Sequence, residues 1–164
     1  MPISLDVSTI TPRAITVDGT SRLRRHLVLL LAAMLVTVPV LARPAEAITP
    51  DEATFAAMAN DVRSNHSVRR LKVTERLSSL ARRHSKRMAA RGELYHSNLR
   101  RVFRGFNYRV VGENVGYAGS LDQLLDAFMD SPPHAQNLLG KWRKTGVGVY
   151  WEGDRVWVTQ LFYF

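Results

Sequence analysis

The 164-residue chain contains no cysteine. This absence excludes a disulfide framework, a thiolate metal site and a cysteine nucleophile. The sequence also lacks Gly-x-Ser-x-Gly, phosphate-cradling loops, paired metal carboxylates and helix-turn-helix signals, so a serine hydrolase is not indicated. No internal repeat or low-complexity tract follows residue 47. The stability of the chain must therefore come from side-chain packing.

Acidic side chains are few relative to basic ones, and the net charge is +9. Residues 48–164 alone hold 18 Lys and Arg against 11 Asp and Glu, which leaves +7. A basic domain favours anionic wall or membrane polymers as partners. The basic residues are not interleaved with aromatic ones, so a solvated helix face is expected and no specific nucleic acid. They cluster at Arg82-Arg83, Lys86-Arg87, Arg91, Arg100-Arg101 and Arg104.

Long hydrophobic runs are missing except for one near the start of the chain. The basic stretch 22–26 precedes the uncharged residues 27–42, and small residues follow at two sites that fit cleavage, after Ala47 or after Ala42. We expect a signal peptide and a secreted protein. The alternative is an N-terminal membrane anchor, although the run is shorter than the roughly 20 residues that span a bilayer. Residues 1–21 are polar and show no pattern.

With 46% hydrophobic residues, the chain fits one globular domain, and we place it at residues 48–164 after an extension and leader at 1–47. The capping box of Thr49 and Glu52 predicts a helix to about Ser64. Apolar residues at helical spacing predict a second helix from about Thr74 to Gly92. Further helices are expected over residues 120–131 and 134–139.

From Gly146 onward the hydrophobic pattern alternates with a period of two. It predicts a hairpin of strands 146–151 and 156–162 around the turn 152–154, and a further strand is expected over residues 108–111. Helices placed early and in the middle, with strands late, indicate an α+β domain in which helices cover a small antiparallel sheet.

Several short motifs occur in one fixed order. They are Asn60 with Arg63, Leu77-x-x-Leu80-Ala81-x-x-His84-Ser85-x-x-Met88, His96-Ser97, Gly112-Glu113-Asn114, Ser131-Pro-x-His134-x-x-Asn137-Leu138-Leu139 and Gly146-Val-Gly-Val149. The ordered set resembles the bacterial branch of the CAP family, also called SCP, from about Asp51 to the end. This family unites cysteine-rich secretory proteins, insect venom antigen 5 and plant pathogenesis-related proteins. The resemblance implies an α-β-α sandwich.

The resemblance also implies that His96, Glu113 and His134 meet in one cleft, with Ser131 and Asn114 beside them. The family cleft commonly holds two histidines and two glutamates, and Ser131 stands here where a second glutamate is expected. Ser131 is then a candidate to orient His134. The catalytic candidates are the three residues His96, Glu113 and His134, and whether the protein is an enzyme stays open.

Two imidazoles and a carboxylate suffice as ligands for Zn²⁺ or another divalent cation, so His96, His134 and Glu113 are candidate metal ligands. The same residues could instead serve acid–base chemistry. Structural roles are the simpler alternative. Glu113 could hold the turn around Gly112, and Asn114 could hold the loop toward Gly116. Both histidines could be buried with satisfied hydrogen bonds, and His84 is expected in the core.

Three functions follow from these residues. The leading one is a monomeric exported module that binds a small ligand, a lipid or a divalent cation in the cleft. The second is a metal-assisted hydrolase of wall or peptide substrates, in which the metal activates water. The third is electrostatic adhesion of the basic domain to wall or membrane polymers.

Overall fold

The computed structural model describes residues 4–10 and 47–164. The elements run β1 (Ser4–Ile10), α1 (Pro50–Asn65), β2 (Lys72–Val73), α2 (Glu75–Arg91), α3 (Leu99–Val102), β3 (Val111–Ala118), α4 (Leu121–Asp130), α5 (Pro132–Leu138), β4 (Lys144–Glu152) and β5 (Arg155–Tyr163). The predicted leader, its cleavage at Ala42 and the hydrophobic run lie outside the described residues. Within the part that is described, no helix is long and apolar enough to cross a membrane.

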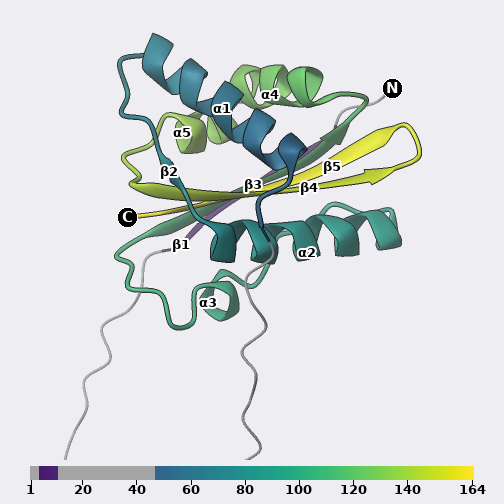
Figure 1. Cartoon of the computed structure of the whole chain (residues 1–164), viewed down its shortest axis with the longest axis horizontal. Helices are drawn as coiled ribbons and strands as arrows, with labels where there is room; N and C mark the ends of the chain where they lie inside the picture. Colours follow the sequence, from purple (N-terminus) through teal and green to yellow (C-terminus); the bar gives the residue numbers. More distant parts are fainter. Residues whose placement is uncertain (1–3, 11–46) are drawn as a thin grey trace, which may run out of the picture. The chain divides into compact units, whose positions relative to one another are not determined.

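The strands form one sheet in the order β1-β3-β5-β4-β2. All neighbours are antiparallel except β2 and β4, which are parallel. Helices α1, α4 and α5 lie on one face of the sheet, here called the α1 layer, and α2 and α3 form the α2 layer on the other (Figure 1). The predicted α+β sandwich is confirmed.

The local signals in the sequence placed the helices well. Thr49 and Glu52 form the predicted capping box of α1, with Pro50 at the first helical position. Helix α2 ends at Gly92, whose φ of 63° lies in the left-handed region that glycine tolerates. The hairpin of β4 and β5 is also confirmed, and its turn contains Gly153 with φ of 59°.

Two strands were not predicted. Residues 4–10 fall in the stretch that we described as unpatterned, yet they pair with β3 from Ser4↔Tyr117 to Ile10↔Val111. The apolar Leu5 and Val7 do alternate with polar residues there, a period of two that is typical of strands. The two-residue β2 is too short to show any period.

The expected strand over residues 108–111 was misplaced, because β3 begins at Val111 and continues to Ala118. Glycine at 112 suggested a turn, but the reason for it is packing. A Cβ at this position would lie 3.1 Å from the Trp142 ring and 3.2 Å from the side-chain oxygen of Asn137. Gly112, Glu113 and Asn114 therefore form part of a buried strand.

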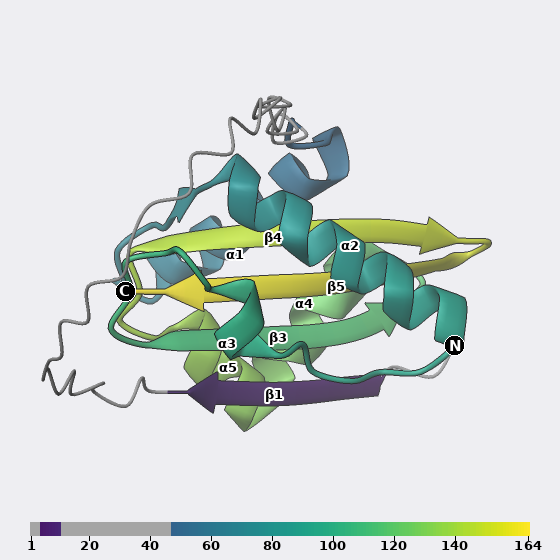
Figure 2. The same cartoon turned by 90° about the horizontal axis from the view of Figure 1, so that it is seen from below.

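A core fills the space on each side of the sheet. In the α1 layer it is built around Phe55, Leu124, Phe128, Val158 and Phe162, all fully buried. Toward the α2 layer it contains Leu77, Ala81, Met88, Trp157 and Leu161. Helix α2 runs over β4 and β5 (Figure 2). Gly148 permits this contact, since a Cβ there would collide with the backbone of Ala81 and Arg82.

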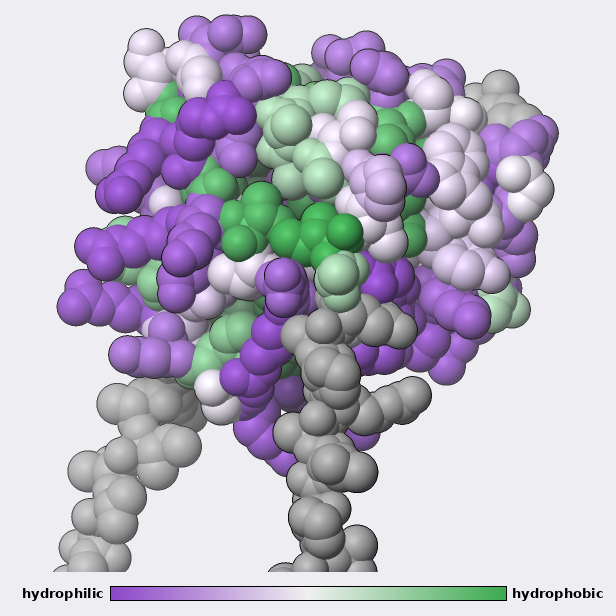
Figure 3. Space-filling view, in the orientation of Figure 1, coloured by the Kyte–Doolittle hydropathy of each residue, from purple (hydrophilic) through white to green (hydrophobic). Residues whose placement is uncertain are grey.

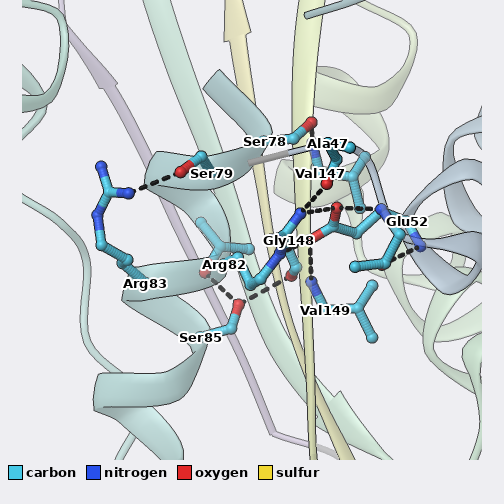
Figure 4. A network of polar contacts seen from close by, with 12 residues as sticks. Ala47, Glu52, Ser78, Ser79, Arg82, Arg83, Ser85, Val147, Gly148 and Val149 are labelled. Atoms are coloured by element: carbon cyan, nitrogen blue, oxygen red, sulfur yellow. Dashed lines mark hydrogen bonds and ion pairs between the residues drawn. The ribbon is translucent and has the colours of Figure 1, made fainter. Parts of the chain in front are cut away.

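A buried ion pair ties both layers to the sheet. Glu52 is fully buried, and its carboxylate accepts two hydrogen bonds of 2.6 Å from Arg82 on α2. The same carboxylate accepts a longer bond of 3.4 Å from the backbone N–H of Val149 on β4. Figure 4 shows Glu52 and Arg82 beside Val149, with Arg82 also donating to the carbonyl of Ala47 at 2.8 Å. One carboxylate thus caps α1 and joins α1, α2 and β4.

Candidate functional site

The site motif Gly112-Glu113-Asn114 lies on β3, where successive side chains point to opposite faces of the sheet. Glu113 points into the α2 layer, since it bonds His96 and Ser97 of the segment between α2 and α3. Asn114 points into the α1 layer, where it bonds α5. Both are completely buried. The strand therefore divides the predicted site between two layers.

In the α2 layer, Glu113 and His96 form a close pair. One carboxylate oxygen of Glu113, Oε2, lies 2.8 Å from Nδ1 of His96 and accepts a 2.9 Å bond from the backbone N–H of Ser97. The His96 side chain is 18% exposed. A carboxylate at Nδ1 favours the tautomer with the proton on that nitrogen. His96 is thus the residue of the pair that lies nearest to solvent.

His84 supports the segment that carries His96. Its Nε2 lies 2.8 Å from the carbonyl oxygen of Tyr95, and Arg87 contacts its Nδ1 at 3.2 Å. Burial lowers the pKa of His84 below its ordinary value of 6.5. The charge of Glu113 and the bond to Tyr95 oppose this shift, whereas Arg87 and His96 add to it. The prediction that His84 lies in the core is confirmed, since it is 2% exposed.

In the α1 layer, His134 belongs to a different cluster. Its Nδ1 lies 2.7 Å from the Ser131 hydroxyl, and its ring stacks on Phe128 with centroids 5.1 Å apart. Asn114 donates to the carbonyl of His134 at 3.1 Å and accepts from Asn137 at 2.9 Å. The expectation that Ser131 orients His134 agrees with this geometry. Asn114 holds α5 against β3 and does not shape a turn.

The structure thus brings His96 and Glu113 together and places His134 on the other side of the sheet. Among the residues that the structure describes, no three His, Asp or Glu side chains lie close enough to hold a metal ion. The structure gives the predicted Zn²⁺ set of His96, Glu113 and His134 no support, and the set stays a prediction. His96 precedes α3 in the α2 layer, whereas His134 lies on α5 in the α1 layer.

Sequence reasoning missed several polar atoms that line these layers. Glu113 Oε1 and Ser97 Oγ are buried with no hydrogen-bond partner among residues 4–10 and 47–164, and so is the hydroxyl of Tyr95. Ser8 of β1 is paired directly opposite Glu113 in the sheet. Of these residues, only Ser97 could be suspected from the sequence, because it stands next to His96. The positions of the other polar atoms depend on the strand register, which the sequence did not reveal.

A sequence model of the CAP family, described as the cysteine-rich secretory protein family, matches residues 56–162. The chain belongs to the CAP family. A search of curated proteins gave no match.

Solved structures share the CAP fold. An extracellular protein with an SCP domain from Bacillus anthracis is 24% identical with a TM-score of 0.60, and the match covers 69% of this chain and 40% of that one. A cysteine-rich secretory protein from Staphylococcus aureus is 22% identical, with a TM-score of 0.60 and coverage of 73% and 40%. An outer surface protein from Borrelia burgdorferi is 14% identical, with a TM-score of 0.64 and coverage of 71% and 94%. The chain spans less than half the length of the first two proteins.

Two of the motif residues of this CAP domain have structural roles. Asn60 donates to the carbonyl of Leu71 and accepts from its N–H at 2.7 Å, which fixes the connection from α1 to β2. Arg63 is 1% exposed and donates to the carbonyls of Arg69, Leu138 and Gly140. Burial lowers the pKa of Arg63. Arg63 thus holds the end of α5, and neither Arg63 nor Asn60 is part of the His96–Glu113 pair.

Proposed function

We propose that this CAP domain is an exported binding module that recognises a polar ligand through the His96–Glu113 pair. The observation that carries the proposal is the 2.8 Å contact between a partly exposed imidazole and a fully buried carboxylate. A buried carboxylate is costly unless its charge is used or compensated. Here it is held by a backbone N–H and by a ring that reaches the surface.

The chemistry of the pair defines the class of ligand. With its Nδ1 proton directed to Glu113, His96 keeps Nε2 as an acceptor; this atom is buried, so a ligand must enter beside the ring to bond it. A ligand with a hydroxyl or an ammonium group fits this acceptor, and a small molecule or a lipid headgroup could carry either. Glu113 Oε1 and Ser97 Oγ, which have no hydrogen-bond partner in the part of the chain that the structure describes, are further polar atoms beside this acceptor.

Export is part of the proposal. It is supported by the basic, apolar and small-residue order of residues 22–47. It also agrees with two of the similar structures, which come from an extracellular protein of B. anthracis and an outer surface protein of B. burgdorferi. A secreted location explains how the domain would meet ligands of walls or membranes.

A binding role is better supported than a metal-assisted hydrolase. The hydrolase would need His96, His134 and Glu113 as one ligand set, and these residues face different layers of the sheet. The pair itself could still act as a general base, because a carboxylate-backed imidazole suits that task. If the protein turns over a bound ligand and the His96→Ala variant does not, the domain is an enzyme and not only a binding module.

The test is a ligand screen by NMR on the purified chain, with hydroxyl- and amine-bearing small molecules and with lipid vesicles. We expect specific binding that is lost in His96→Ala and weakened in Glu113→Gln. His66→Ala is the matched control, since His66 is exposed and its ring lies against the Val62 carbonyl of its own helix turn. Binding that all three variants retain would refute the proposed site.

A further inference from the structure

A cavity at one end of the sheet is separate from the His96–Glu113 pair. It lies where β3 and β4 begin and β5 ends, and its volume is about 290 Å³. Seven residues line it: Asn107, Tyr108, Arg109, Arg143, Lys144, Tyr163 and Phe164. The marked C-terminus lies at this end in Figure 1, and Figure 3 shows hydrophilic side chains gathered there on the visible face.

The charged side chains that line this cavity all have the same sign. Three of the lining side chains are cations, Arg109, Arg143 and Lys144, and none is acidic. The ion pairs of the described residues include none of these three cations. Their mutual repulsion is therefore not relieved by a neighbouring carboxylate side chain. Such a cluster favours an anion.

The cations are held in place by aromatic rings. The Arg143 guanidinium lies 4.6 Å from the centroid of the Phe164 ring, and Arg109 lies 6.0 Å from the same centroid. The Lys144 ammonium lies 5.4 Å from the Tyr163 ring. Contacts of this kind are weakly attractive and restrict the long side chains. Little conformational entropy then remains to be lost when a ligand binds.

The backbone around the cavity is also fixed. Arg109 N–H donates to the Phe164 carbonyl at 2.6 Å, and Phe164 N–H donates to the Val110 carbonyl at 3.1 Å. Arg143 N–H donates to the Tyr163 carbonyl at 3.1 Å. The two chain segments that carry the cations are thus both joined to residues 163–164. The cavity is part of the sheet framework and not a gap between loose loops.

From this geometry we propose that the cavity binds the phosphate group of a small organic phosphate ester. A phosphate monoester carries nearly two negative charges and three acceptor oxygens, which match three cations better than a singly charged carboxylate does. Arginine binds phosphate oxygens through its planar fork. A volume at the lower end of the range for ligand pockets leaves room for a small attached group, which would pack on Tyr108, Tyr163 and Phe164.

The proposal does not depend on the proposed role of His96 and Glu113. The ester could be a soluble metabolite or the headgroup of a lipid, since both offer the same phosphate chemistry. In either case the basic domain would bind one phosphate group at a specific site, in contrast to nonspecific electrostatic adhesion to anionic polymers. A His96→Ala variant should bind the phosphate ester as the unaltered chain does, so failure of one proposal leaves the other intact.

The experiment is calorimetric titration of the purified chain with phenyl phosphate, inorganic phosphate and phenol. We expect one-to-one binding of phenyl phosphate, weaker binding of inorganic phosphate and none of phenol. Arg143→Gln and Lys144→Gln should each weaken the binding of phenyl phosphate by about tenfold, because each removes a charge-assisted hydrogen bond. Arg143→Lys keeps the charge but loses the planar guanidinium, so its affinity should lie between those of the unaltered chain and Arg143→Gln.

Arg100→Gln is the control, because Arg100 is exposed on α3 and its loss changes the net charge equally. Vesicles of phosphatidylcholine with and without phosphatidic acid distinguish the two sources. Phosphatidic acid binding that Arg143→Gln abolishes indicates a lipid, and binding of the soluble ester alone indicates a metabolite. Equal losses in Arg100→Gln and Arg143→Gln, or no saturable binding by the unaltered chain, would overturn the proposal. Thermal unfolding verifies that each variant is folded.

Discussion

Glu113 and Asn114 are neighbours in the chain, yet β3 directs their side chains into opposite layers of the protein. Glu113 meets His96 beneath α2 and α3, and Asn114 meets the carbonyl of His134 on α5. The two histidines expected to share a cleft therefore lie on elements that cover opposite faces of the sheet. The alternation of side-chain direction along β3 thus determines which residues lie together in the candidate site.

Glu52→Gln should destabilise the protein. The substitution removes the charge that compensates Arg82, whose side chain is only 18% exposed, and it weakens the cap of α1. Because Arg82 keeps some contact with solvent, we expect a loss of about 2–3 kcal/mol, below the cost of breaking a wholly buried pair. Urea unfolding of both proteins measures the difference.

Asp61→Asn is the matched control for Glu52→Gln. Asp61 also lies 2.6 Å from an arginine, Arg70, but the two side chains are 67% and 53% exposed. Solvent screens such a pair, so its loss should cost about 0–1 kcal/mol. Equal effects of the two substitutions would show that burial of Glu52 adds nothing to its ion pair.

Gly148→Ala should destabilise the packing of α2 on β4. The added Cβ would meet the backbone of Ala81 and Arg82, which cannot move aside as a flexible side chain could. We expect a loss of about 1–3 kcal/mol, measured by thermal unfolding. Gly92→Asn is the control, since nothing lies within 4 Å of a Cβ there and asparagine tolerates its φ of 63°. A Gly148→Ala variant as stable as the control would contradict the close approach of α2.

His84 should make stability depend on pH. Its pKa is lowered in the folded state, so the unfolded chain binds more protons as the pH falls below about 6.5. The contribution of His84 to the unfolding free energy is complete above that value. It decreases as the pH falls toward the folded pKa, and it changes no further below it.

Urea unfolding of the parent protein and of His84→Gln between pH 5 and pH 8 (a range chosen to bracket about 6.5) tests this dependence. We expect the stability difference between them to shrink with decreasing pH. Arg87, His96 and Glu113 surround His84 and remain in both proteins, so the difference between the two proteins reports on His84. A difference that stays constant over the range would contradict a lowered pKa.

The leader predicts two candidate N-termini for the exported protein. Cleavage after Ala47 would remove the residue whose carbonyl accepts a bond from Arg82, whereas cleavage after Ala42 would keep it. Either cut also removes Ser4–Ile10, so that β3 becomes an edge strand of the exported domain. Intact-mass spectrometry of protein from the culture medium distinguishes the two. Exported protein that still contains residues 4–10 would contradict the leader.

The helices and the hairpin could be predicted because their signals are local. The capping box of Thr49 and Glu52 marks the start of α1, and Gly92 marks the end of α2. The alternation of apolar residues after Gly146 predicts β4 and β5. Strands β1 and β2 depend on partners that lie far away in the chain. Nothing local specifies those partners.

Only part of the candidate site could be predicted from the sequence. Short motifs identified its residues, but they did not show toward which layer of the protein each side chain points. A shift of one residue in a strand moves every side chain to the other layer, and the predicted strand stopped one residue before Gly112. Pairing of Glu113 with Leu161 sets the register, and this contact spans 48 positions of the sequence. Only the assembled sheet separates His134 from the pair.

The most direct measurement is ¹⁵N NMR of the histidine side chains in the purified protein, repeated in Glu113→Gln and His134→Ala. We expect that Nδ1 of neutral His96 carries the proton, that Glu113→Gln alters the tautomer balance of His96, and that His134→Ala leaves it unchanged. A His96 resonance that responds to His134→Ala as strongly as to Glu113→Gln would contradict this expectation, because the two histidines would then belong to one site.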